Sequence, residues 1–505
     1  VDVAGRSLSY AEAVDGARRW AAAYRRLGVA RHDLVATMQL NSVDGMLGWL
    51  GLVWLGAVEA PLNVDYRGTL LAHALNVTGA RVALVAAPYA DRLAEVASDL
   101  EHLKTVVVVE GDPPALPFET MGGPDLHTGV EPAFDLGLPE PWDLMGVLFT
   151  SGTTGPSKAV RIPWAQLHAT ATGTFPLADL GPDDVIYNPG PSYHVGAKAF
   201  PFMAALVGGR QVVRPFLSLS ELGTDYLAHG VTTGLPPFPW LAEPEGEADA
   251  GRPLRNLLVP VAMPGIDELR RRFGCRTYGC YNMTELSVPI ADPDWDVAHL
   301  DEHGRMSCGR ARPGYELRVA DEHDRPLPPG EVGELLVRAD APWVLNDGYL
   351  HMPEATAAAW RNGWFHTGDA FVQDADGWFY FVDRIKDCIR RRGENISSFE
   401  VEAHVAAHPE VADCAAVAVK LADAPGADEE VKVVVVRAPG GSVSAEQLVE
   451  WLVPRMPRFM IPRFVEFVEA LPRTPTTKVR KVELRRQGVT EATWDREEAG
   501  VVLPR

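Results

Sequence analysis

The chain is short of positive charge. It has 47 Lys and Arg residues against 68 Asp and Glu residues, which gives a formal net charge of −21. Nucleic acids and anionic membranes attract basic surfaces, so this balance argues against both as partners. An anionic substrate must therefore be bound by local donors rather than by the overall field of the molecule. We expect no nucleic acid and no membrane among the partners.

Cysteine is scarce and scattered. The five cysteines stand at positions 275, 280, 308, 388 and 414, without a C-x-x-C pair. An odd, dispersed set fits neither a disulfide framework nor a zinc site, and a reducing cytoplasm is the expected location.

Long hydrophobic runs are also rare. The most apolar run, residues 46–62, contains Glu59 and two glycines and is shorter than a membrane span, so it predicts a buried helix. The first residues show no signal-peptide pattern.

The chain is too long for one hydrophobic core and predicts at least two domains. Strand-like apolar runs alternate with helical segments, which predicts α/β layers with largely parallel sheets. Ser9 followed by Glu12 is a capping-box pattern and predicts the start of a helix over 13–27. Near residue 383 a basic cluster and a new α/β pattern begin. We place a large domain at 1–383, a hinge at 384–387 and a small domain at 388–505.

Residues 151–160 (SGTTGPSKAV) follow a strand-like run. Glycines and hydroxylated residues let backbone N–H groups and hydroxyls surround an anion, and Lys158 adds a mobile positive charge. The spacing differs from that of P-loop NTPases, and such a loop alone is more often a surface connection. We interpret it as a phosphate-binding loop for a nucleoside triphosphate. Its residues are Thr150, Ser151, Gly152, Thr153, Thr154, Gly155 and Lys158.

Four more segments follow in order: 279–285 (GCYNMTE), 364–369 (WFHTGD), 383–387 (DRIKD) and 471–481 (LPRTPTTKVRK). With the phosphate loop they resemble the adenylate-forming superfamily of acyl-CoA synthetases, luciferases and adenylation domains. The tail at 488–497 looks like the crotonobetaine/carnitine-CoA ligase branch. The resemblance implies an α/β adenylate-forming enzyme fold. A large N-terminal domain would contain stacked α/β subdomains and a β-rich subdomain, and a small, mobile C-terminal α/β domain would close over it.

The resemblance also implies roles for these segments. Thr284 would contact phosphate, Glu285 would hold Mg²⁺, and Asp369 would accept both ribose hydroxyls, for which a carboxylate has two acceptor oxygens. Arg384 would contact the ribose or phosphates, and Lys386 would be the pivot of the hinge. The other nucleotide-site residues are Gly279, Cys280, Tyr281 and Asn282. Each of the first three segments also has a purely structural interpretation. Taken alone, 279–285 would be the start of a helix, Asp369 an aspartate in a turn, and 383–387 a run of solvated charges.

Lys478 matches the family lysine that reaches the substrate carboxylate and the α-phosphate, and Lys481 is its competitor. Two residues depart from the family pattern, because Asn282 and Thr477 stand where glycine is usual. Asparagine tolerates positive φ better than most residues, so the turn at Asn282 is expected to survive. Thr477 is expected to stiffen its loop.

The acid pocket is expected around residues 189–197 (PGPSYHVGA). In acyl-CoA synthetases a histidine at the place of His194 approaches the carboxylate, although a lone histidine is more often structural. The adenylation domains of this superfamily that activate amino acids have an aspartate in this region, which pairs with the α-ammonium group. No carboxylate occurs here between residues 185 and 220, so the resemblance argues against an α-amino acid. Lys198 is a candidate contact for a polar or anionic tail, the alternative being a surface lysine. The substrate residues are Tyr193, His194, Val195, Lys198, Met263, Gly279 and Met283.

Joining a carboxylate to the α-phosphorus of ATP brings two anions together, so charge neutralisation and positioning dominate the chemistry. The catalytic residues are expected to be Lys478, Thr284, Glu285 and His194. The expected reaction is activation of a small carboxylic acid by MgATP, followed by transfer of the acyl group to coenzyme A. Gly393 and Asn395 match family residues that line the channel of the thiol after the C-terminal domain rotates.

Several alternatives stay open. The acceptor can be a carrier-protein thiol or an amine, and the activated acid an unusual one such as nitrite. A luciferase-like oxygenase and a noncatalytic binding protein are further alternatives. The sequence leaves the oligomeric state open, with a homodimer among the options.

Overall fold

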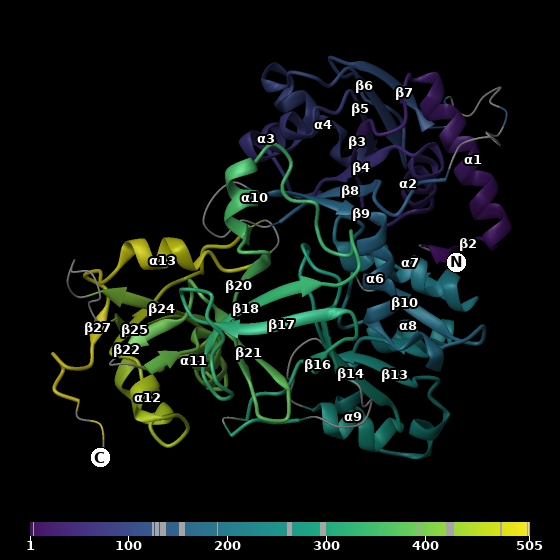
Figure 1. The fold of residues 1–505 in the computed structure, drawn as a ribbon. Coiled ribbons are helices and arrows are strands. Elements are labelled where there is room, and N and C mark those ends of the chain that lie inside the picture. Colours follow the sequence, from purple (N-terminus) through teal and green to yellow (C-terminus); the bar gives the residue numbers. More distant parts are fainter. Residues whose placement is uncertain are drawn as a thin grey trace.

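The computed structural model describes most of the chain. The described residues are 1–3, 5–123, 126, 131, 138–150, 157–188, 190–259, 265–292, 299–302, 304–391, 394–420, 429–474, 477–501 and 503. They form four larger sheets and one two-stranded ribbon, with helices around them (Figure 1). None of the described helices is both long and apolar enough to cross a membrane.

The first sheet has the strand order β7-β6-β5-β3-β4-β8-β9, and only its last pair, β8 and β9, is antiparallel. Its strands are β3 (Leu34–Met38), β4 (Val58–Pro61), β5 (Val82–Ala86), β6 (Thr105–Val109), β7 (Glu119–Gly122), β8 (Leu144–Phe149) and β9 (Ala159–Pro163). Its helices are α1 (Tyr10–Arg26), α2 (Val43–Leu55), α3 (Gly68–Thr78) and α4 (Ala87–Glu95). Val82 and Leu84 face the core of α1 and α2, whereas Ala83 and Val85 face that of α3 and α4. Both faces are covered, so the central strands are apolar throughout.

Two local predictions can be compared with this sheet. The capping box is confirmed: Ser9 N donates to Glu12 Oε2 at 2.7 Å, and Glu12 N donates to Ser9 Oγ at 3.2 Å. The prediction of one buried helix over residues 46–62 is wrong. Helix α2 ends at Gly56, whose φ of 70° is a left-handed conformation suited to glycine, and the remaining residues form β4.

The second sheet has nine strands, in the order β16-β15-β14-β13-β12-β10-β11-β1-β2. They are β1 (Asp2–Val3), β2 (Arg6–Ser7), β10 (Val185–Asn188), β11 (Arg210–Val213), β12 (Thr233–Gly234), β13 (Asn256–Val259), β14 (Arg276–Tyr281), β15 (Ile290–Ala291) and β16 (Arg310–Ala311). Its helices are α6 (Trp164–Thr174), α7 (Val195–Val207), α8 (Leu222–His229) and α9 (Ile266–Phe273). A shared apolar core that includes Trp49 of α2, Leu148 of β8 and Phe200 of α7 joins it to the first sheet. The predicted stack of α/β layers is confirmed.

The third sheet is built largely from antiparallel strands: β17 (Tyr315–Ala320), β18 (Gly333–Ala339), β19 (Trp360–Arg361), β20 (Trp364–Gln373) and β21 (Phe379–Arg384). Helix α10 (Pro353–Ala359) lies beside it. This is the β-rich subdomain that the resemblance implies. The turn 374–377 (DADG) joins β20 to β21 and sets Asp369 opposite Arg384.

The C-terminal elements lie beside this sheet (Figure 1). They are β22 (Ile389–Arg391), β23 (Glu394–Ile396), α11 (Ser398–Ala406), β24 (Val411–Lys420), β25 (Glu429–Arg437), α12 (Ala445–Leu452), β26 (Phe464–Phe467), α13 (Lys481–Gln487) and β27 (Trp494–Asp495). Within the described residues, their strands pair only with one another. The limits 1–383, 384–387 and 388–505 stay a prediction.

Candidate active site

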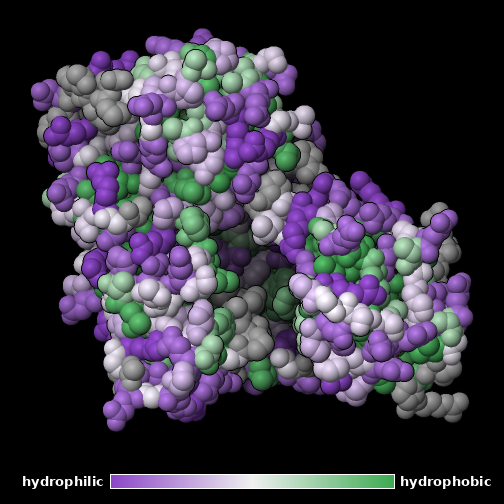
Figure 2. Space-filling model, turned by 180° about the vertical axis from the view of Figure 1, so that it is seen from behind, coloured by the Kyte–Doolittle hydropathy of each residue, from purple (hydrophilic) through white to green (hydrophobic). Residues whose placement is uncertain are grey.

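A cavity of about 2290 Å³ opens between the large sheets and the C-terminal elements, and Figure 2 shows a deep hollow in this part of the surface. Cys280, Tyr281 and Asn282 line it from the end of β14. Asp369 and Arg384 line it from β20 and β21. The cavity therefore lies against three of the segments that the sequence assigns to nucleotide binding, 279–285, 364–369 and 383–387.

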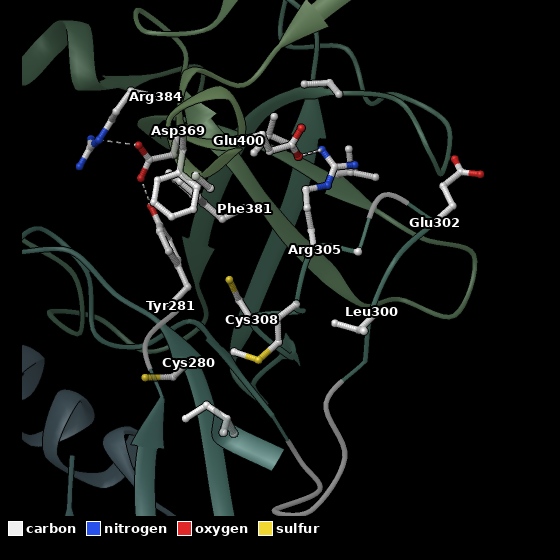
Figure 3. Close-up of a pocket in the computed structure, with 18 of the residues that line it drawn as sticks. Cys280, Tyr281, Leu300, Glu302, Arg305, Cys308, Asp369, Phe381, Arg384 and Glu400 are labelled. Atoms are coloured by element: carbon white, nitrogen blue, oxygen red, sulfur yellow. Dashed lines mark hydrogen bonds and ion pairs between the residues drawn. The ribbon is translucent and has the colours of Figure 1, made fainter. Parts of the chain in front are cut away.

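Asp369 is fixed by two neighbours (Figure 3). Its Oδ2 accepts a 2.6 Å hydrogen bond from the Tyr281 hydroxyl, and its Oδ1 lies 2.9 Å from Nε of Arg384. The residue is 2% exposed. Burial raises the pKa of the Asp369 carboxyl, and the positive charge of Arg384 opposes that rise. The carboxylate is thus held in one orientation at the wall of the cavity.

Glu285 is buried and held through both its side chain and its backbone. The Tyr349 hydroxyl donates to Glu285 Oε1 at 3.0 Å, and both the backbone N and the Nδ2 of Asn346 donate to the Glu285 carbonyl, at 3.1 and 3.0 Å. Burial raises the pKa of Glu285, whereas the Tyr349 hydrogen bond and the charges of Arg384 and Lys158 lower it. The Lys158 ammonium lies 4.6 Å from the centre of the Tyr349 ring.

The backbone on either side of Glu285 is fixed by Gln166 of α6. Its Nε2 donates to the carbonyls of Thr284 and Leu286, at 2.9 and 2.8 Å. Sequence reasoning missed Gln166, Asn346 and Tyr349. The segment 345–350 (LNDGYL) carries turn residues and an aromatic, but nothing local indicates that it meets Glu285.

The carboxylate of Glu285 suits a magnesium ion shared with phosphates, because Mg²⁺ in nucleotide sites is held by one or two carboxylates plus phosphate oxygens. Among the described residues, no group of three or more His, Cys, Asp and Glu side chains gathers into a complete metal cage. Glu285 as the metal residue stays a prediction.

Lys478 lies near this site although it belongs to the C-terminal part of the chain. The surrounding protein lowers the pKa of its ammonium, the charge of Arg384 lowers it further, and Asp369 and Glu285 act in the opposite direction. Its competitor Lys481 has other partners, because its Nζ lies 2.5 Å from Ser398 Oγ and 2.8 Å from Glu402 Oε1. Lys478 is thus coupled electrostatically to residues of the site, whereas Lys481 is bound within the C-terminal part, and the choice of Lys478 stays a prediction.

The residues predicted for the acid lie at the start of α7. His194 directly precedes the helix, and its ring centre is 4.9 Å from that of Tyr193. The surrounding protein lowers the pKa of His194, and the charge of Lys478 adds to this. Burial raises the pKa of Tyr193 to about 12. Val195 is buried in the core, and Met283 Sδ lies 3.6 Å from the Tyr281 hydroxyl oxygen.

Lys198 contradicts both of its expected placements. It is 3% exposed, so it is not a surface lysine. Gly196 and Phe200 of the same helix line the large cavity, but the Lys198 ammonium lies 2.5 Å from Glu59 Oε2 and 4.2 Å from the centre of the Trp49 ring. It lines a separate cavity of about 40 Å³. Its charge is used inside the fold rather than offered to a substrate tail.

The two departures from the family pattern have different structural bases. Asn282 is not among the residues with positive φ, so the expected conformational reason is wrong. Its Oδ1 instead accepts a 2.9 Å hydrogen bond from the backbone N of Val288, which itself has a φ of 57°. Thr477 has a φ of 65°, the left-handed region that glycine adopts without strain.

Some predicted residues lie outside the described part of the chain. These are Ser151, Gly152, Thr153, Thr154, Gly155, Met263 and Gly393, and the side chain of Asn395. The base of the phosphate loop is described: Thr150 N donates to the Lys158 carbonyl at 2.9 Å, at the end of the β8–β9 pair. Gly279 and Cys280 lie on β14. Lys386 belongs to the turn that follows β21.

Known proteins resemble this chain over nearly its whole length. A crotonobetaine/carnitine–CoA ligase from Salmonella agona (strain SL483) is 29% identical over 494 residues, covering 95% of this chain and 93% of the relative. ATP-bound MatB from Rhodopseudomonas palustris aligns with a TM-score of 0.79 at 27% identity, over 96% of this chain and 95% of that one. The anthranilate CoA ligase AuaEII in complex with anthranoyl-AMP has the same fold, with a TM-score of 0.80 at 22% identity, over 95% and 92%.

Family models give the same result. The model of the AMP-binding enzyme matches residues 1–350, and the model of the AMP-binding enzyme C-terminal domain matches residues 400–478. The first match alone covers more than half of the chain, and it contains the phosphate loop and Glu285. The chain belongs to the family of AMP-binding enzymes.

Proposed function

We propose that this protein activates a small carboxylic acid with ATP, forming an acyl-adenylate and pyrophosphate, and then transfers the acyl group to coenzyme A. The observation that carries the proposal is the electrostatic coupling of Lys478 to residues on both sides of the site. A lysine from the C-terminal part lies within electrostatic reach of Arg384, Asp369 and Glu285, and its charge also acts on His194. A positive charge between the nucleotide side and the acid side is what the union of two anions requires.

In the first reaction a carboxylate oxygen attacks the α-phosphorus of ATP, and the bond to pyrophosphate breaks. Lys478 neutralises the charge that builds up on the approaching groups. Asp369 accepts the ribose hydroxyls, because its two oxygens are already oriented by Tyr281 and Arg384. Thr284 and Lys158 contact phosphates. Mg²⁺, when bound beside Glu285, supplies further positive charge to the phosphates.

On the acid side, His194 is the proposed contact for the carboxylate. Its lowered pKa keeps the imidazole neutral near pH 7, so one ring nitrogen carries hydrogen and can donate while the other cannot. A neutral donor orients the acid without competing with Lys478 for the negative charge. Tyr193 and Gly279 are proposed to line the same pocket, and Lys198 is not part of it.

In the second reaction a thiol sulfur attacks the acyl carbon, the bond to the AMP oxygen breaks, and AMP leaves with the electron pair. The thioester forms without a covalent bond to the protein. The names of the relatives support coenzyme A as the thiol. We further propose that the C-terminal part rotates about Lys386 before this step, and that Gly393 and Asn395 then line the channel of the thiol. A carrier-protein thiol and an amine are the alternative acceptors. A homodimer is the proposed oligomeric state. None of the five cysteines forms a disulfide in the described part of the chain, and the cytoplasm is the location that we propose.

The test is release of pyrophosphate and AMP from MgATP across short, polar, aromatic and fatty acids, each with and without coenzyme A. We expect one class of acid to give release that rises with coenzyme A, and a thioester of matching mass. If the release of pyrophosphate and AMP does not change when coenzyme A is added, the proposed acceptor is contradicted, and a carrier protein or an amine is favoured. No release with any acid would contradict the activation step for this panel.

A further inference from the structure

The strand that carries Asp369 leaves the regular ladder just before this residue. In the antiparallel pair of β18 and β20, Leu336 stands opposite His366 and Glu334 opposite Ala370. Residues 367–369 therefore face Leu335 alone, which is a bulge of β20 toward the cavity. Gly368, at its centre, has a φ of 70°. Bulges of this kind redirect a side chain at the price of ladder hydrogen bonds, which must be replaced.

Other groups replace the missing ladder bonds. Gly368 N donates to Oε1 of Glu334 at 2.9 Å. The Thr367 hydroxyl donates to the Leu335 carbonyl at 2.8 Å and accepts from Asp369 N at 3.1 Å. On the other side, the Gly368 carbonyl accepts from Ile385 N at 2.9 Å. The acceptor for Gly368 N is thus a side chain, and its loss would free a glycine that has wide conformational choice.

The carboxylate of Glu334 is itself fixed. Its Oε2 lies 3.0 Å from Nδ1 of His366 and 3.5 Å from Nη2 of Arg361. His366 is 7% exposed, and its Nε2 lies 3.7 Å from Asp324 Oδ2. With Oε2 engaged in this way, Oε1 is directed at Gly368. The histidine of the WFHTGD segment therefore has a structural task that its sequence position did not reveal.

We propose that Glu334 is a positioning residue for nucleotide binding: it holds the bulge at Gly368 so that the Asp369 carboxylate meets the ribose hydroxyls. The inference depends on the proposed contact between Asp369 and the ribose. Glu334 is not among the described residues that line the large cavity. Its effect passes through two adjacent residues, so it is specific to the ribose and does not extend to the base or the phosphates.

The test compares binding of AMP with binding of 2′-deoxyAMP by calorimetry, with the full chain and without any acid. A hydrogen bond to a charged group lost from the ribose corresponds to about tenfold weaker binding, so we expect the wild type to prefer AMP by about tenfold. Glu334→Ala should lower that preference to about twofold, chiefly by weakening AMP. Glu334→Gln keeps an oxygen for Gly368 N and should restore most of the preference. Glu316→Ala is the matched control, because Glu316 is an exposed residue of the neighbouring β17 paired with Arg338.

An unchanged preference for AMP in Glu334→Ala, which includes equal weakening of both nucleotides, would overturn the inference, and so would Glu334→Gln behaving like the alanine variant. A wild type that binds AMP and 2′-deoxyAMP equally well would overturn it too, because Asp369 would then not contact the 2′-hydroxyl of the ribose. Thermal unfolding shows whether each variant is folded. If Glu334→Ala does not fold, the binding preference of Glu334→Gln tests the inference. Failure of the proposed function appears elsewhere: no acid would give pyrophosphate release, while the two binding constants would still differ.

Discussion

The ammonium of Lys198 lies 2.5 Å from Glu59 Oε2, and both side chains are almost fully buried. Glu59 stands on β4 of the first sheet, where the Thr37 hydroxyl donates to its Oε1 at 2.8 Å. Lys198 is on α7 of the second layer, one turn after His194. The pair therefore fixes the helix that follows His194 to the sheet that leads into the phosphate loop.

We expect Lys198→Met to destabilise the protein by about 3–5 kcal/mol, because it leaves the Glu59 carboxylate buried without its partner. The double variant Lys198→Met with Glu59→Met should regain most of this loss, since neither charge then remains. Thermal and urea unfolding of the full chain measure both. Arg19→Ala, which breaks the exposed pair with Asp15, should cost no more than about 1 kcal/mol. A double variant as unstable as the single one would contradict the explanation.

Lys478→Ala should lower the rate of pyrophosphate release by about 10²–10³-fold, the range seen when one charge-stabilising donor is removed. Binding of AMP should change little, because Asp369, Tyr281 and Arg384 remain.

Lys481→Ala is the matched control, since this lysine is bound to Ser398 and Glu402 within the C-terminal part. It should leave the chemical step nearly unchanged and lower stability instead. If Lys481→Ala lost adenylation while Lys478→Ala kept it, the two assignments would be reversed.

The pH dependence of adenylation should reveal the environment of Lys478. Its pKa is lowered by the surrounding protein and by Arg384, so the ammonium loses its proton at a pH below the ordinary lysine value of about 10.4. The reaction needs the charged form, and its rate should fall as the pH rises through the lowered pKa. Lys478→Arg keeps the charge at high pH and should move this alkaline limb upward. If the rate of the arginine variant fell at the same alkaline pH as that of the wild type, the fall would belong to a group other than Lys478.

Asn282→Gly should destabilise the loop after β14 by about 1–2 kcal/mol, because Val288 N is buried and loses its acceptor. Asn282→Asp retains an oxygen at this place and should recover part of the loss. Thermal unfolding and the KM for ATP record the effect. Equal stability of the glycine variant and the wild type would show that the Asn282 side chain is dispensable.

Thr477→Gly should stabilise the loop before Lys478 by about 1 kcal/mol, since Thr477 is held at a φ of 65° that β-branched residues avoid. Thr477→Ala is the comparison, because alanine shares the left-handed penalty. Unfolding midpoints of the two variants test the strain. A glycine variant less stable than the alanine variant would argue that the φ of Thr477 carries no strain.

The sequence predicted those features that depend on local patterns. The capping box at Ser9 and the alternation of strands and helices are short-range patterns, and the structure contains both. The residues that hold the site in place depend on contacts between distant parts of the chain. Gln166 contacts the Thr284 carbonyl across 118 positions, and Tyr349 contacts Glu285 across 64. No periodicity or spacing records such contacts, so only the folded chain reveals them.

Lys198 is a residue whose contact was predicted wrongly from its sequence position. Its place in the sequence, four residues after His194, suggested a contact with the substrate tail. Helical geometry sets residues 196 and 200 toward the cavity, and the partner of Lys198 comes from a strand 139 positions earlier in the chain. A single sequence does not indicate which of several distant carboxylates a buried lysine will meet.

The turn after β21 has one more consequence. Ile385 N is tied to Gly368 of the third sheet, whereas the carbonyl of Lys386 is tied at 2.7 Å to Nη1 of Arg485, which also lies 2.6 Å from Asp387. The turn is also closed on itself, because the Arg384 carbonyl accepts from Asp387 N at 2.8 Å and from Cys388 N at 2.9 Å. The proposed rotation about Lys386 would therefore have to break or carry along bonds on both sides of this residue. One of these bonds ends on Gly368, the residue that directly precedes Asp369.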